Sequence, residues 1–137
     1  MISFSVLGLP VPQGSKNPWG GEASKRLKPW RNDMMVAARR AMDERRQVLL
    51  LEPVDVHLQF CFPRPRAHFG TGRNAGKLKE SAPVYVAKAP DLDKLIRAVG
   101  DALTHSGILH DDGQIAILVA TKVYDRPHGV KVIVSDV

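Results

Sequence analysis

Apolar and polar residues alternate in four stretches of the chain, and this two-residue period predicts four β-strands. In the clearest of them Val54, Val56 and Leu58 alternate with Asp55 and His57. Each strand should therefore bury one face and leave the other polar. The four stretches cover residues 2–6, 54–62, 115–123 and 130–134.

Two further stretches repeat their apolar residues at helical spacing. The first covers residues 29–47, with Pro29 suited to the first helical position. The second begins after Asp91, a good N-cap residue, and ends at Gly107. On a helical projection its apolar residues occupy one arc, whereas the opposite side carries Asp93, Lys94, Arg97 and Asp101.

The order strand, helix, strand, helix, strand, strand predicts an α/β fold, with a mixed β-sheet packed against two main helices. The length of 137 residues and the hydrophobic content of 44% fit a single domain covering residues 1–137. The pattern leaves the strand order open. Cys61 is the only cysteine, which excludes an intrachain disulfide, and we expect it to be a half-buried strand residue. Because the chain shows neither a signal peptide nor a membrane-spanning stretch, we expect a cytoplasmic protein without a membrane partner.

Basic residues dominate the segment between the second strand and the second helix, residues 63–90, where Glu80 is the single acid. We interpret this segment as an arm that grips DNA and becomes ordered on binding. Phe69 and Tyr85 are candidates either for stacking on exposed bases or for anchoring the arm to the core. The expected DNA-binding residues of the arm are Arg64, Arg66, Arg73, Lys77, Lys79 and Lys88.

Two other basic regions leave both a functional and a structural interpretation open. The Pro- and Gly-rich segment over residues 10–21 carries Lys16, which either meets a phosphate or belongs to a plain connecting loop. The first helix carries Arg31, Arg39 and Arg46 on its polar side, which is either a solvated face or a contact to a nucleic-acid backbone. A net charge of +6 favours a polyanionic partner in either case.

Aspartates are clustered at both ends of the second helix, as Asp91 and Asp93 and as the adjacent pair Asp111 and Asp112. We expect the turn with the second pair to return to the same end of the sheet as Asp91. Converging carboxylates would suit Mg²⁺, which prefers oxygen ligands and keeps water and phosphate in its remaining positions. Arg97, one turn beyond Asp93, could orient that carboxylate or stabilise charge on a phosphate. The alternative is that each aspartate caps a helix or forms a surface pair.

These residues resemble a known family. The stretch Pro90-Asp-Leu-Asp-Lys-Leu-Ile-Arg-Ala-Val-Gly-Asp-Ala-Leu103, followed by Gly107-Ile-Leu-His-Asp-Asp-Gly-Gln-Ile115, is similar to the signature of RusA-type Holliday-junction resolvases of bacteria and prophages. The stretches Pro10-Val-Pro-Gln-Gly-Ser-Lys16 and His68-Phe-Gly-Thr-Gly-Arg-Asn-Ala-Gly76 are similar to phage-type members. The resemblance implies a homodimeric endonuclease that nicks paired strands of a four-way DNA junction and depends on Mg²⁺, with Mn²⁺ as a substitute.

The resemblance also implies roles for individual residues. The family's metal-binding aspartates fall on Asp91, Asp93 and Asp112, and Asp111 would assist them. A lysine that is important in well-known members falls on Arg97. Since arginine hardly deprotonates, it keeps the charge but is a poor proton donor, and Lys94 is the candidate to supply a proton.

A second class of function competes with the nuclease. A non-catalytic DNA-binding or architectural protein of the same fold would keep the basic arm and use the aspartates structurally. A phosphohydrolase acting on small phosphates is a third hypothesis, but a dispersed basic arm exceeds what such a substrate needs. Metal-dependent nicking of a branched substrate separates the first two.

Overall fold

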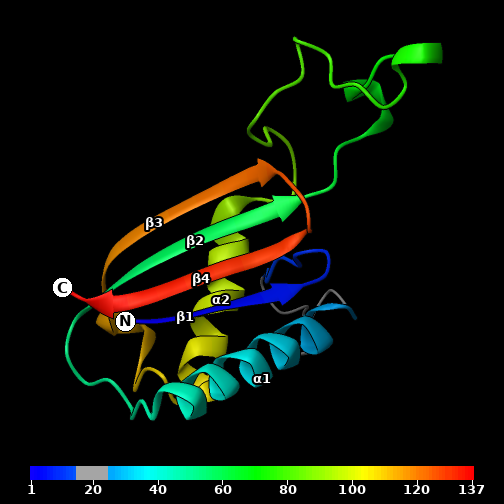
Figure 1. Ribbon diagram of the computed structural model, residues 1–137. Coiled ribbons are helices and arrows are strands. Elements are labelled where there is room, and N and C mark those ends of the chain that lie inside the picture. Colours follow the sequence, from blue (N-terminus) through cyan, green and yellow to red (C-terminus); the bar gives the residue numbers. More distant parts are fainter. Residues whose placement is uncertain (15–24) are drawn as a thin grey trace.

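A computed structural model describes residues 1–14 and 25–137 of the chain. It consists of one β-sheet, two helices that pack against one face of the sheet, and an arm that projects beyond one end of it (Figure 1). Lys16 lies outside the described residues, so its expected contact with a phosphate has no structural counterpart here. Neither helix in the described ranges combines the length and the apolar character that crossing a membrane requires.

The sheet has four strands in the order β1-β4-β2-β3. β4 pairs antiparallel with both of its neighbours, β1 and β2, whereas β2 and β3 are parallel. The predicted mixed sheet is therefore confirmed, and the strand order that the pattern left open is established. The strands are β1 (Ile2–Leu7), β2 (Val54–Phe62), β3 (Ile115–Tyr124) and β4 (Gly129–Asp136).

The two helices are α1 (Leu27–Arg45) and α2 (Leu92–Ser106). α2 has the predicted bounds: Asp91 is at the N-cap position, and Gly107 ends the helix with a φ of 88°, a conformation that favours glycine. α1 begins two residues before Pro29, so the prediction that Pro29 is the first helical residue is wrong. Leu27 is buried in the core, and its burial favours the additional residues at this end.

The core lies between the sheet and the two helices. Val54, Val56, Leu58 and Phe60 of β2 are buried there, whereas Asp55, His57 and Gln59 alternate with them. Since successive side chains of a strand point to opposite faces, these polar residues belong to the face that the helices do not cover. The core also includes Val130, Val132 and Val134 of β4, Met34 and Ala38 of α1, and Leu95, Val99 and Leu103 of α2.

One strand position, Gly129, needs a close approach of the backbone, and its partner Cys61 on β2 is buried. A Cβ atom on Gly129 would lie 2.0 Å from the Val6 carbonyl oxygen, so only glycine permits the pairing of β4 with β1 at this point. Cys61 pairs with Gly129 from the other side and is buried, not half-buried as expected. Burial raises the pKa of the Cys61 thiol, which suits an inert structural cysteine.

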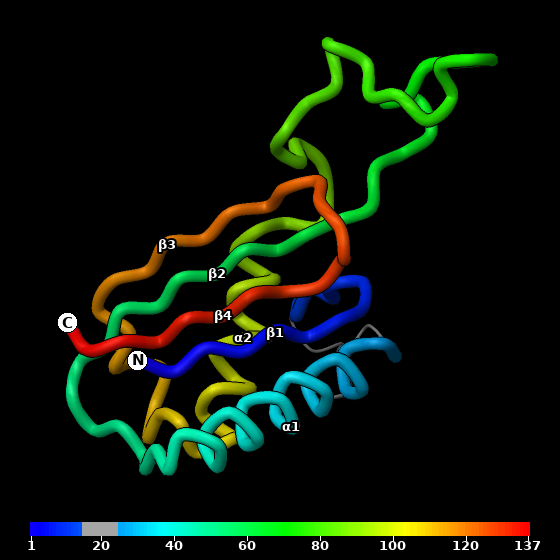
Figure 2. The backbone as a smooth tube through the Cα atoms, viewed as in Figure 1, coloured from blue at the N-terminus to red at the C-terminus, as the bar shows by residue number. Residues whose placement is uncertain are grey.

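The arm leaves the sheet where β2 and β3 end, as the backbone trace shows (Figure 2). It contains two short 3₁₀-helices, Arg66–His68 and Gly72–Asn74, and a bridge between Phe69 and Leu78. Gly70 N donates to the Lys77 carbonyl at 3.0 Å, and Lys79 N donates to the His68 carbonyl at 2.9 Å. The arm thus has its own backbone hydrogen bonds; the expectation that it becomes ordered on binding DNA stays a prediction.

Candidate active site

The first turn of α2 presents Asp91 to solvent. Its backbone takes the N-cap conformation, but its carboxylate makes no capping hydrogen bond. It lies 3.4 Å from Lys94 Nζ, and both side chains are about half exposed. An ion pair at this exposure is weak, so the carboxylate remains available to a ligand.

Asp93 and Arg97 are both exposed and lie one helical turn apart on α2. Within residues 1–14 and 25–137 they form no ion pair with each other, so the expected orientation of Asp93 by Arg97 is not seen. Asp101, which the helical projection grouped with them, has a different role. Its Oδ2 accepts a hydrogen bond from Gln13 Nε2 at 2.6 Å and lies 3.8 Å from Arg31 Nη1. The polar side of α2 is therefore divided into a structural part at Asp101 and an open part at Asp93 and Arg97.

Asp111 organises the turn before β3. Its Oδ2 accepts from Gly113 N at 3.2 Å, and the Gln114 Oε1 accepts from Asp111 N at 2.9 Å. Gln114 Nε2 in turn donates to the carbonyls of Leu50 and Glu52, which ties the turn to the loop before β2. The side chain of Asp111 is thus used to hold a 3₁₀-helix, Asp112–Gln114, in place.

Asp112 lies against the middle of α2. A Cβ atom added to Gly100 would be 3.7 Å from both Cβ and Oδ2 of Asp112. Gly100 is seven residues beyond Asp93, about 10 Å along the helix axis at the usual rise per residue. The expectation that Asp111 and Asp112 return to the same end of the sheet as Asp91 is wrong. The turn leaves the far end of α2, and only five residues separate Asp112 from that end.

Asp93, Arg97 and Gly100 nevertheless share one side of the helix, because residues spaced by three, four and seven lie one above the other. Asp112 therefore joins the open part of α2 from the neighbouring turn. We call this surface, formed by Asp93, Arg97 and Asp112, the acidic face; Asp91 lies at the start of the same helix.

The acidic face suits a magnesium ion that is held by one or two carboxylates, but not one that is held by three. In the part of the chain that the structure describes, no three His, Cys, Asp or Glu side chains form a group that could hold a metal ion. The expected convergence of Asp91, Asp93 and Asp112 is thus not assembled among these residues. Mg²⁺ is commonly held by one or two carboxylates, with water and substrate phosphate completing its shell, and exposed aspartates without capping bonds suit that mode.

Lys122 is a residue of the site that the sequence analysis missed. Its Nζ donates to the carbonyls of Lys88 and Pro90, each at 2.7 Å, so it fastens the end of the arm beside Asp91. Only the pairing of the strands reveals it: Lys122 pairs with the buried Phe60, and so it lies on the side of β3 that faces the helices. A lysine at such a position needs a partner, and the arm's carbonyls supply it.

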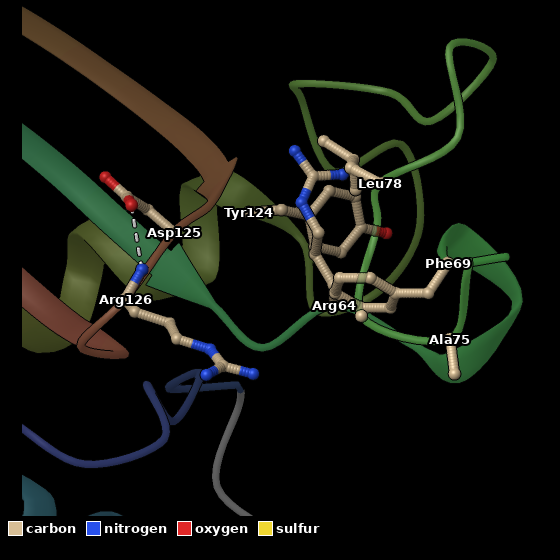
Figure 3. A pocket seen from close by; sticks show the side chains of 8 residues that line it. Arg64, Phe69, Ala75, Leu78, Tyr124, Asp125 and Arg126 are labelled. Atoms are coloured by element: carbon tan, nitrogen blue, oxygen red, sulfur yellow. Dashed lines mark hydrogen bonds between the residues drawn. The ribbon is translucent and has the colours of Figure 1, made fainter. Parts of the chain in front are cut away.

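The predicted DNA-binding residues of the arm fall into two groups. Arg64 holds the arm together: its Nη1 donates to the Pro83 carbonyl at 2.7 Å, and its guanidinium lies 5.2 Å from the centre of the Tyr124 ring (Figure 3). The His68 ring lies at a right angle to the same tyrosine ring, and desolvation together with nearby Arg64 lowers the pKa of His68. The remaining five residues are exposed: Arg66, Arg73, Lys77, Lys79 and Lys88.

The two aromatic candidates of the arm also differ. Tyr85 forms a backbone bridge with Val123 at the edge of the sheet, and its side chain is largely exposed. Phe69 is half-buried and lines a pocket at the base of the arm. Tyr85 therefore anchors the arm through its backbone, whereas the ring of Phe69 faces a cavity.

The basic side of α1 is partly used inside the molecule. Arg31 contacts Gln13 and Asp101, and Arg39 Nη2 donates to the His105 carbonyl at 3.3 Å. Such contacts favour the structural interpretation of this face.

An α/β domain with exposed carboxylates on one helix, next to a projecting basic arm, has the features of a nuclease. The chain matches the family described as Endodeoxyribonuclease RusA over residues 11–135. Because this match covers nearly the whole chain, the chain belongs to the RusA endodeoxyribonuclease family, whose members resolve Holliday junctions. The resemblance drawn from the sequence is thereby confirmed. A comparison with curated proteins found no match.

Replacing Lys122 tests its role as a positioning residue. Lys122→Met keeps the aliphatic stem but removes two charge-assisted hydrogen bonds, so we expect the free energy of unfolding to fall by about 1–2 kcal/mol. Junction cleavage should fall more than junction affinity, because Pro90 adjoins Asp91. Urea denaturation and cleavage assays measure both effects. Lys28→Met, an exposed lysine of α1, is the matched control, and equal stability of the two variants would contradict the role.

Proposed function

We propose that the protein is a Mg²⁺-dependent endonuclease that resolves four-way DNA junctions by paired strand nicking. The observation that carries this proposal is the acidic face, where Asp112 reaches Gly100 on the same side of α2 as Asp93 and Arg97. Carboxylates that face DNA repel its phosphates unless a cation is bound between them. A purely architectural protein gains nothing from such a surface, so the acidic face favours the enzyme over the non-catalytic alternative.

The candidate ligands are Asp91, Asp93 and Asp112. Because these three do not converge among the described residues, one or two of them would hold the ion together with water and substrate phosphate. Asp111 would position Asp112 through the turn. When bound, Mg²⁺ would activate water and offset charge on the scissile phosphate, and Mn²⁺ could replace it. The chain's own contribution is to place a phosphate at the start of α2, where free backbone N–H groups and the helix dipole attract anions.

Arg97 and Lys94 complete the proposed machinery. Arg97 stays charged throughout the reaction and is exposed between Asp93 and Asp112, so it would stabilise negative charge that develops on the phosphate. It cannot readily donate a proton to the leaving oxygen. Lys94, whose Nζ lies near Asp91, is the residue that could do so.

The arm would supply contacts to the DNA backbone. Its five exposed basic residues are spread along the segment and do not converge on one point, which suits phosphate contacts more than base reading. Because Lys122 fastens the end of the arm beside Asp91, DNA bound along the arm is led to the acidic face.

Paired nicking requires two active sites, and we propose that a second copy of the chain packs on the face of the sheet away from the helices. Three β-branched residues are substantially exposed there, although such residues are usually buried: Ile117, Val119 and Ile133. Val119 and Ile133 flank His57 in one row across β3, β2 and β4.

The charges on this face are self-complementary. Asp55 lies on one side of the row and Lys131 lies on the other, two residues away in each direction along the strands. A two-fold axis along the row would set Lys131 of one copy over Ser135 of its partner, one strand away from the partner's Asp55. Two-fold symmetry of this kind also matches the equivalent strands of a junction.

Substitution of the aspartates tests the catalytic assignment. Asp91→Asn, Asp93→Asn and Asp112→Asn each remove a ligand charge at nearly constant shape, so each should abolish Mg²⁺-dependent cleavage of a synthetic four-way junction. Junction binding in EDTA should stay equal or become tighter, since a negative charge facing DNA is lost. Asp111→Asn should do less harm, with losses of roughly 10–100-fold at most. Cleavage is followed on denaturing gels, with linear duplex and metal-free reactions alongside.

Asp101→Asn is the matched control on the same helix, because Asp101 is engaged by Gln13 and Arg31 and lies outside the acidic face. It should cleave at nearly the wild-type rate. Near wild-type cleavage by the four variants of the candidate site would contradict the proposed active site and favour the non-catalytic DNA-binding function. These four are Asp91→Asn, Asp93→Asn, Asp111→Asn and Asp112→Asn.

Neutralising the arm should weaken binding through electrostatics alone. The triple change Arg73→Gln, Lys77→Gln and Lys79→Gln should lower junction affinity and reduce the slope of log affinity against log salt by up to about 0.9 per lost phosphate contact. Binding is measured by fluorescence anisotropy over a range of salt concentrations. The control triple changes Lys28 and Arg40 of α1 and Arg46 at its C-cap to Gln. A larger loss in this control would place the DNA on α1 instead.

A charge on the open sheet face should separate the two copies. Ile133→Asp would bury an unpaired carboxylate in the proposed interface, so sedimentation should show a dimer for the wild type and a monomer for the variant. Junction products should shift from paired to single nicks. Val36→Asp, at an exposed valine of α1, should remain dimeric. A monomeric wild type, with and without junction DNA, would count against the dimer.

A further inference from the structure

The pocket at the base of the arm suggests a binding site of its own, and we propose that it receives an unstacked nucleotide of the DNA strand. Its volume is about 630 Å³, within the range of roughly 300–1,000 Å³ that is usual for sites of small organic ligands. Arm and sheet both contribute to it. Phe69, Ala75 and Leu78 come from the arm, and Tyr124, Asp125 and Arg126 come from the end of β3 and the following turn (Figure 3).

The walls of the pocket are held in place by contacts already described. The backbone pairing on either side of Phe69 and Leu78 fixes the arm wall, with hydrogen bonds of 3.0 Å and 2.9 Å. The Arg64 guanidinium over Tyr124, and its bond to the Pro83 carbonyl, fix the arm to the sheet wall. Gly70 allows the tight turn, because a Cβ atom there would lie 2.6 Å from Cβ of Asn74 and 2.7 Å from its carbonyl oxygen.

The chemistry of the lining matches the parts of a nucleotide. Phe69 and Leu78 offer an apolar surface on which a base can stack, and every base has a face suited to an aromatic ring. Arg126 is exposed, and its guanidinium has no partner within residues 1–14 and 25–137, so it can bind a phosphate oxygen. The Asp125 carboxylate accepts from Arg126 N at 2.8 Å and keeps acceptor capacity for a base amino group.

The position of the pocket connects it to the proposed function, on which the choice of DNA as ligand rests. Tyr124 lies two residues beyond Lys122, about 7 Å along the strand, and Lys122 contacts the residue before Asp91. A strand whose phosphate lies at the start of α2 could thus place a nearby nucleotide in the pocket. Bases at a branch point are the ones whose unpairing costs least, and bases taken out of the stack are typically held in pockets with aromatic and apolar walls.

The test uses two single strands and no metal, so its outcome does not depend on cleavage. A labelled strand of ten deoxycytidines is compared with a ten-unit abasic strand that carries the same phosphates, by fluorescence anisotropy in EDTA. Phe69→Ala should weaken binding of the deoxycytidine strand by about 5- to 150-fold, the range for losing one stacked base. Binding of the abasic strand should not change. Arg126→Ala should weaken binding of both strands and reduce the salt slope by about 0.7.

Two further variants separate stacking from damage to the arm. Phe69→Leu keeps an apolar wall, and it should retain the wild-type melting temperature while still losing affinity for the deoxycytidine strand. Tyr85→Ala removes an exposed aromatic ring that lies on the arm outside the pocket, and it should leave both affinities unchanged. An unchanged deoxycytidine affinity in both Phe69 variants, or equal losses on the two strands, would overturn the proposal.

The result is distinguishable from failure of the proposed function. If the wild-type protein fails to cut junctions but Phe69→Ala weakens binding of the deoxycytidine strand alone, the pocket is supported and the resolvase activity is rejected. If the wild-type protein cuts junctions but Phe69→Ala causes no such loss, the resolvase activity is supported and the pocket is rejected.

Discussion

The parallel pairing of β2 with β3 is the constraint on which the rest of this structure depends. Parallel neighbours cannot be joined by a tight turn, so the chain must travel from the end of β2 back to the start of β3. The arm and α2 make that return. The start of α2 is consequently placed beside the root of the arm, and the turn with Asp111 and Asp112 is placed at the opposite end. Both the acidic face and its basic neighbour follow from this one connection.

The two ends of α2 differ in their electrostatic environment and in their hydrogen bonds. At its start, Asp91 and Asp93 lie where the helix dipole and free N–H groups attract anions. Lys122 adds a positive charge there while its hydrogen bonds are satisfied by two carbonyls. At the far end, hydrogen bonds of Asp111 and Gln114 fix the turn, and Asp112 lies against Gly100. The carboxylate proposed to bind the ion is thus positioned by a neighbour that does not bind it.

The sheet separates the two proposed surfaces of the molecule. One face is buried against α1 and α2, and the acidic face lies along the exposed side of α2. The other face carries the row of Val119, His57 and Ile133, with Asp55 and Lys131 on either side. A dimer through that row would leave both acidic faces free, because they lie beyond the helices on the outer sides of the pair. Catalysis and assembly would therefore make no competing demands on the same residues.

Much of the fold was determined by the sequence alone, since it depends on local periodicity and local caps. The alternation around Val54 and Val56 set β2, and Asp91 and Gly107 set the bounds of α2, because these signals act over a few residues. The candidate aspartates were also found in the sequence, as residue types with a spacing that suits a metal. Only the tertiary structure decided the strand order, the division of α2 between Asp101 and the acidic face, and the position of Asp112 halfway along the helix. Lys122 and Arg126 lie far from Asp91 and Phe69 in sequence, so the chain pattern could not link them. The physical reason is that such contacts arise from the packing of distant segments, which no local period encodes.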